Sequence, residues 1–166
     1  MADPCVQYTF GSVTINGAAT TDTLVTPDFD SITGLDGAPL RRQIDPASQT
    51  DGDLNLQGAY KAGRVIVFKG IIHIGTLGGP DGTGSVDPTN PLFIQKVITL
   101  QKAVVSACEA QFSSSATLSW TDSTGAARSI TCFYGLPGST ISFGGSIGNP
   151  TFDGLTLWAP SPTISG

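Results

Sequence analysis

The stretch from Arg64 to Ile74 places the strongest constraint on how this chain can fold. Side chains of a β-strand alternate between two faces, so one face of this stretch would carry the apolar set Ile66, Phe68, Ile72 and Ile74. The opposite face would carry Val65, Val67, Lys69, Ile71 and His73. Because both faces are largely apolar, both must be covered, either by a second layer of the same fold or by another protein molecule.

The composition is that of a turn-rich β protein with a weakly charged surface. Charged residues make up 13% of the 166 residues, about half the usual share, while the chain holds 21 glycines and 11 prolines. The length suits one compact domain, so we expect residues 1–166 to form a single domain. Surfaces of this kind often contact other subunits, and a secreted β domain is the alternative interpretation.

The charge balance disfavours nucleic-acid binding. The net charge is −5, and the only adjacent basic residues are Arg41 and Arg42, which do not make the phosphate-neutralising cluster that such binding needs. An acidic protein could still line a channel through which DNA slides, since repulsion prevents sticking.

The residues for catalysis or metal binding are scarce. His73 is the only histidine and lies inside the predicted strand, so we interpret it as structural. The aspartates lie mostly in turn sequences, and the sole glutamate is Glu109, so neither a calcium loop nor a clustered metal site is predicted. We therefore expect no enzymatic activity, no cofactor and no metal.

The cysteines and the hydrophobic segments bear on the compartment. Cys5, Cys108 and Cys132 are odd in number and widely spaced, which favours reduced thiols, with Cys108 and Cys132 packed as small apolar residues. The first residues lack the pattern of a signal peptide, and no stretch reaches the ~18 apolar residues of a membrane span. We expect folding in the cytosol and no membrane contact.

The pattern along the chain predicts a mainly β (α+β) fold, a sandwich or barrel of antiparallel strands flanked by one helix. The helix should run from Pro91 to about Phe112, across one face of the sheet, because apolar residues recur there at spacings of three and four. The predicted strand segments are 6–15, with a hairpin turn at Asn16-Gly17, then 20–26, 28–34, 64–74, 116–121, 126–134, 139–143 and, after a turn at 148–150, 151–158.

Three segments fall outside this regular pattern. Residues 34–63 are rich in turn signals and suggest an extended arm used for contact, with a plain surface loop as the alternative. Residues 75–90 have the most flexible composition. The tail APSPTISG is so rich in Pro and Ser that we expect it to need a partner for order.

The order of elements and three short segments carry a resemblance to a known family. GLDGAPLRRQ, GAYKAGRVIVFKGII and FDGLTLWAPSP resemble stretches of the N-terminal ring domain of distal tail proteins from long-tailed, non-contractile bacteriophages. The resemblance spans essentially the whole chain. It implies a structural virion protein that forms a hexameric ring between the tail tube and the tail tip or baseplate, continuing the DNA channel.

The same resemblance implies partners and candidate interface residues. The partners would be further copies of the chain, the tail tube protein and tail-tip or baseplate hub proteins, with DNA passing through the lumen unbound. The protein would be assembled in the host cytoplasm and reside in the virion. No separate receptor- or carbohydrate-binding domain is expected within these residues. The arm would reach a neighbouring protomer, and the candidate interface residues are Arg41, Arg42, Arg64, Val65, Val67 and Ile71.

Two alternatives remain open at this point. The tail tube subunit of the same phages shares the ring fold, but stacks into long tubes. A carbohydrate-binding β-sandwich would display aromatic side chains on a flat face, whereas most tryptophans and tyrosines here fall at positions that alternate into the core.

Overall fold

The computed structural model describes residues 6–17, 21–36, 40–41, 44–46, 53–55, 60–75, 89, 91–146 and 148–166. Its regular elements are, in chain order, β1 Tyr8–Phe10, β2 Val13–Ile15, β3 Thr23–Val25, the 3-10 turn η1 Phe29–Ser31, β4 Ile32–Thr33, β5 Leu40–Arg41, β6 Ile44–Pro46, β7 Asp53–Asn55, β8 Tyr60–Lys61, β9 Arg64–His73, α1 Pro91–Glu109, β10 Ala116–Thr121, β11 Ala127–Tyr134, β12 Ser142–Ser146 and β13 Asn149–Ala159. The mainly β prediction with one long helix is confirmed.

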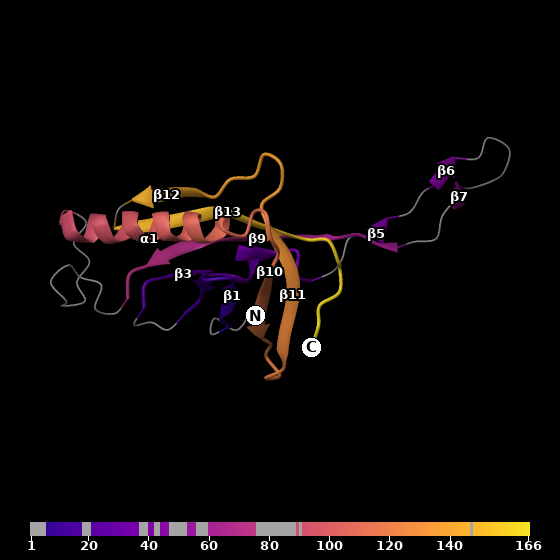
Figure 1. Ribbon diagram of the computed structural model, residues 1–166, viewed down its shortest axis with the longest axis horizontal. Coiled ribbons are helices and arrows are strands. Elements are labelled where there is room, and N and C mark those ends of the chain that lie inside the picture. The colour runs from indigo at the N-terminus through magenta and orange to yellow at the C-terminus, as the bar shows by residue number, and fades with distance from the viewer. Residues whose placement is uncertain are drawn as a thin grey trace.

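The main sheet closes into a barrel. Its strand order is β12-β13-β11-β10-β1-β2-β3-β9-β4, and β13 also pairs with β9. That pairing closes a ring of seven strands, and β12, which lies beside β13 in Figure 1, and β4 extend the sheet outside it. All pairings in the barrel are antiparallel except the one between β2 and β3. Closure removes the exposed sheet edges that invite aggregation.

Strand β9 is the centre of the fold, as its sequence predicted. Ile66, Phe68, Ile72 and Ile74 are buried in one continuous core with residues from β1, β2, β3, β10, β11, β13 and α1. On the other face Val67 and Ile71 are half-buried, and Val65 is 41% exposed. Within the barrel, therefore, only one of the two apolar faces of β9 is fully covered by its own chain.

The helix contributes its predicted stripe to the core. Phe93, Val97, Val104 and Cys108 are buried, and Leu100 is partly buried against the same cluster. Glycine-free and rich in β-branched residues, the helix depends on this packing more than on intrinsic propensity. It ends at Glu109, followed by turn hydrogen bonds from Gln111 and Phe112, close to the predicted end.

The first hairpin differs from the prediction. β1 pairs with β2 so that Phe10 lies opposite Val13, which puts the two-residue turn at Gly11-Ser12, with Gly11 at φ 57°. The predicted turn at Asn16-Gly17 is therefore wrong. Asn16 does adopt a positive φ of 59°, but its side chain binds the Val6 carbonyl and the amide of Thr26 instead. The Asn16-Gly17 dipeptide correctly indicated a residue with positive φ, but the hairpin turn itself lies at Gly11-Ser12.

Three further expectations need correction. Residues 28–34 do not form one strand: the capping box between Asp28 and Ser31 winds the chain into η1, and only β4 follows. The strand predicted at 139–143 lies at Ser142–Ser146. The turn predicted at 148–150 includes Gly148, but β13 already begins at Asn149, which pairs with Ser146. The C-terminal tail does not depend on a partner, because Ser165 pairs with Ser129 of β11 within the chain.

The hairpin formed by β10 and β11 is confirmed. Leu118 lies opposite Ile130, and both side chains are buried. Cys108 and Cys132 are free and fully buried, as predicted, while Cys5 lies outside the described residues. In the described part of the chain, no helix is long and apolar enough to cross a bilayer.

Candidate interaction surface

The described residues offer surfaces and a structural junction more than a chemical site. Within them, no group of three or more His, Cys, Asp or Glu side chains lies close enough to hold a metal ion. His73 lies half-buried in β9, in register with Thr23 of β3. The candidate interface residues lie on the barrel wall and in segment 34–63.

Arg64 occupies a junction of three segments. Its side chain is 8% exposed, and its Nε donates to the Pro162 carbonyl at 2.7 Å. Nη1 donates to the Leu35 carbonyl at 2.9 Å and to the Gly34 carbonyl at 3.3 Å. A buried guanidinium needs such acceptors, because an unpaired charge in the interior is costly. Three carbonyls from two distant segments thus accept hydrogen bonds from Arg64.

The junction joins the three sequence segments that carried the family resemblance. Gly34 and Leu35 belong to the first segment, Arg64 to the second and Pro162 to the third. These segments are far apart along the chain, yet one side chain connects them. The three segments therefore meet at one place in the fold.

Glycines allow the backbones to approach closely there. Gly34 has φ 89°, and a Cβ on it would lie 1.9 Å from the Val65 carbonyl oxygen. A Cβ on Gly63 would lie 2.7 Å from the carbonyl oxygen of Ala159. Both ends of the segment 34–63 are therefore packed against the barrel wall with no room for a side chain.

We call segment 34–63 the arm; its described strands form two short pairs. β5 pairs with β8, and β6 pairs with β7, both antiparallel. These pairs lie away from the barrel, to one side of the molecule (Figure 1). A two-stranded ribbon alone is marginally stable in water, so an arm of this kind gains order from whatever it contacts.

An apolar row crosses the outer wall of the barrel next to the junction. Phe133 of β11, Trp158 of β13 and Val65 of β9 are cross-strand neighbours, with Trp158 opposite both others. The rings of Phe133 and Trp158 have their centroids 5.9 Å apart. Trp158 is 39% exposed and Val65 41%. We call this set the outer apolar row.

The remaining candidate residues are less defined. Val67 and Ile71 lie half-buried on the same outward side of β9 as Val65. Arg41 belongs to β5 in the arm, where only its backbone is described, and Arg42 lies outside the described residues. The structure thus brings Arg64, Val65 and Val67 to one region and leaves the interface role of all six residues a prediction.

Sequence reasoning missed Trp158, Phe133 and Pro162 as members of this region. The sequence analysis places most tryptophans and tyrosines in the core, yet strict alternation from the buried Leu155 and Leu157 puts Trp158 on the outer face. That signal was present in the sequence. The neighbourhood of Phe133 and Pro162 was not, because it depends on which strands pair.

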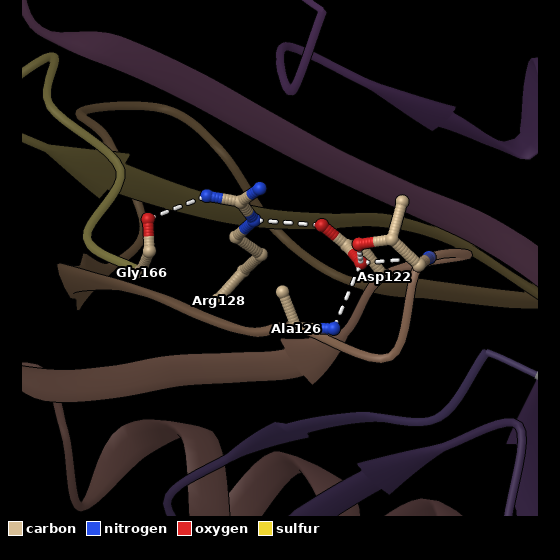
Figure 2. Close-up of polar contacts among 5 residues, drawn as sticks. Asp122, Ala126, Arg128 and Gly166 are labelled. Carbon is tan, nitrogen blue, oxygen red and sulfur yellow. Dashed lines mark hydrogen bonds and ion pairs between the residues drawn. The ribbon is translucent and has the colours of Figure 1, made fainter.

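A polar cluster lies at the turn that joins β10 to β11 (Figure 2). Asp122 accepts from the Thr124 hydroxyl at 2.6 Å, from Arg128 Nε at 2.8 Å and from the Ala126 amide at 3.0 Å. These hydrogen bonds, led by those of Thr124 and Arg128, hold the pKa of Asp122 well below its usual range. Arg128 also donates to the Gly166 carbonyl at 2.6 Å, which helps to hold the tail on β11.

Comparison with known proteins shows a similar fold without sequence similarity. No family model and no curated protein sequence matches the chain. Among solved structures, the crystal structure of the SPP1 Dit protein, described as a paradigm of the hub adsorption apparatus in phages that infect Gram-positive bacteria, matches with a TM-score of 0.58 and 10% identity. The match covers 97% of this chain and 52% of SPP1 Dit, so the chain spans about half the length of that protein.

Proposed function

We propose that this protein is a distal tail protein of a long-tailed bacteriophage, a structural component of the virion. The observation that carries the proposal is the fold: 97% of the chain follows the fold of SPP1 Dit, a phage adsorption hub protein. The three segments that resemble distal tail proteins add to it, because they meet at Arg64 in the structure.

In this function six copies would form a ring. The outer apolar row offers each copy a surface whose burial against a neighbour is favourable, and the arm projects beyond its own barrel (Figure 1). A ring of identical copies requires head-to-tail contacts that close after a fixed rotation. An arm from one copy and a barrel wall on the next meet that requirement.

The ring would join the tail tube to hub proteins of the tail tip or baseplate and continue the DNA channel. The net charge of −5 suits a lumen through which DNA passes without binding. Its partners would be the tube protein above and the hub proteins below, in a particle assembled in the host cytoplasm.

Electron microscopy and sedimentation of the purified protein test this proposal. We expect six-fold rings in negative stain and a sedimenting mass of about six chains, given closed cyclic symmetry. Long filaments would favour the tail tube subunit instead. Monomers at high concentration that bind glycans on an array would favour the carbohydrate-binding module and overturn the proposal.

A further inference from the structure

We propose that Arg64 is the positioning residue of the arm: its guanidinium fixes the arm's direction by tying the arm's base to the segment that follows β13. Neither the fold comparison nor the resemblance assigns Arg64 this role. The inference rests on the proposed function only for its last consequence, which is ring closure.

The first step is that the arm continues a hairpin of the barrel. β4 pairs with β9 through Ile32–Phe68 and Thr33–Val67. Farther out, Leu40 pairs with Lys61, and Ile44 pairs with Asn55. As the residue numbers rise on the first strand of each pair, those of the partner fall by nearly the same amount, as in a single long antiparallel ribbon. The arm is therefore the outer part of the β4–β9 hairpin.

The second step is that this ribbon has a joint. Of the described residues between the two parts, 34–36 and 62–63 belong to no strand. At Gly34 the φ of 89° takes the backbone out of the extended conformation. Without ladder hydrogen bonds, a two-stranded ribbon has little to fix its angle at such a point.

The third step is that Arg64 provides the missing bonds. The carbonyls of Gly34 and Leu35, on the leg that leaves the barrel, accept from Nη1. Arg64 itself is the first residue of β9, where the returning leg enters the barrel, and its Nε donates to the Pro162 carbonyl. One planar, rigid group thus holds both legs and a third segment. A lysine offers one compact ammonium on a flexible stem and cannot reproduce this fork.

Hydrogen exchange by mass spectrometry, with Arg64→Met, Arg64→Lys and Arg128→Met, tests the inference. Arg128 is a matched control, because it also donates to a carbonyl of the C-terminal segment, but at the far hairpin. In Arg64→Met we expect amides of the paired residues on either side of the joint, 32–33 in β4 and 60–61 in β8, to exchange at least about tenfold faster, the effect of losing one charge-assisted bond. Peptides from β10 and β13 should keep their protection. Arg64→Lys should fall between, and Arg128→Met should leave the arm base unchanged.

Two further readouts separate positioning from general stability. Cleavage by trypsin after Arg41 should be faster in Arg64→Met than in the wild type. In Arg64→Lys the melting temperature of the barrel should shift little from the wild-type value. Under conditions where the wild type forms rings, Arg64→Met should yield folded chains that do not close. Equal exchange at the arm base in wild type and Arg64→Met would overturn the inference. If the wild type forms no rings but the exchange result holds, the proposed function fails and the role of Arg64 stands.

Discussion

At the scale of single residues, close backbone contacts and buried polar groups distinguish positions that look alike in the sequence. Gly34 and Gly125 both lie in turns at positive φ, 89° and 82°. A Cβ on Gly34 would meet the Val65 carbonyl, whereas one on Gly125 would meet nothing within 4 Å. An alanine at Gly125 would therefore introduce backbone strain alone, whereas an alanine at Gly34 would add a steric clash with β9.

We predict that Gly125→Ala costs about 1–2 kcal/mol in the free energy of unfolding, the strain of a left-handed alanine. Gly34→Ala should cost about 1–3 kcal/mol more, because β9 must shift away from the new methyl group. Denaturant titration of both variants measures the difference. Equal losses would mean that the contact between Gly34 and β9 is looser than the structure shows.

A second residue-scale prediction concerns the thiols. Burial raises the pKa of Cys108 to about 12, with a smaller contribution from Glu109, and burial raises the pKa of Cys132 to about 12. At pH 8 neither should react with iodoacetamide in the native protein, and both should react after unfolding in guanidinium, as read by peptide mass mapping.

The raised pKa values of Cys108 and Cys132 make the free energy of unfolding depend on pH. A thiol whose pKa is raised on folding binds its proton more tightly in the native state, so its contribution is complete below the unfolded pKa of about 8.5. Stability should therefore decline as the pH rises above that value. Cys132→Ala should weaken the decline, and a wild-type stability that is flat between pH 8 and 10 would contradict this prediction.

At the scale of elements, the arm and the helix show two different sources of order. The helix is held by a buried stripe of apolar side chains that includes Phe93 and Val104. The spacing of these residues in the sequence predicted that stripe. The arm is fixed at its base, by Arg64 and by Gly34 and Gly63. Beyond the base its strands pair only with one another among the described residues.

We predict that deletion of residues 36–58 leaves a folded barrel that does not form rings. The core residues that the structure describes lie outside this segment, so the circular dichroism spectrum and cooperative melting should persist. Sedimentation should give the mass of one chain. Rings formed by the truncated chain would show that the arm is not needed for assembly.

At the scale of the whole molecule, the closed barrel leaves specific apolar side chains outside. Val65, in the outer apolar row, is 41% exposed, and Ile98 on α1 is 44% exposed. Their similar exposure makes them a matched pair for finding the face that contacts another copy.

We predict that Val65→Lys prevents ring formation and that Ile98→Lys does not. A lysine in the outer apolar row would have to bury its charge in the contact between copies. Neither change should alter unfolding by more than about 0.5 kcal/mol, since both sites are exposed. Light scattering after size exclusion gives the mass of each variant. The reverse pattern would move the contact to the helix face.

The sequence by itself determined the class of fold, the helix, the hairpin of β10 and β11 and the central place of β9. These depend on periodicity and turn chemistry, which act between near neighbours: Leu118 and Ile130 face each other because a four-residue turn at Asp122–Gly125 joins their strands. Cys108 and Cys132 were likewise placed by their apolar surroundings in the sequence.

The tertiary structure alone decided the closure of the barrel and the junction at Arg64. Closure depends on the pairing of β9 with β13, and the junction joins Arg64 to a carbonyl 98 residues away. A sequence pattern states how much of a strand must be buried, but not which distant strand covers it. From the sequence Arg64 is a candidate interface residue; its three carbonyl acceptors cannot be foreseen there, because they come together only when the barrel closes.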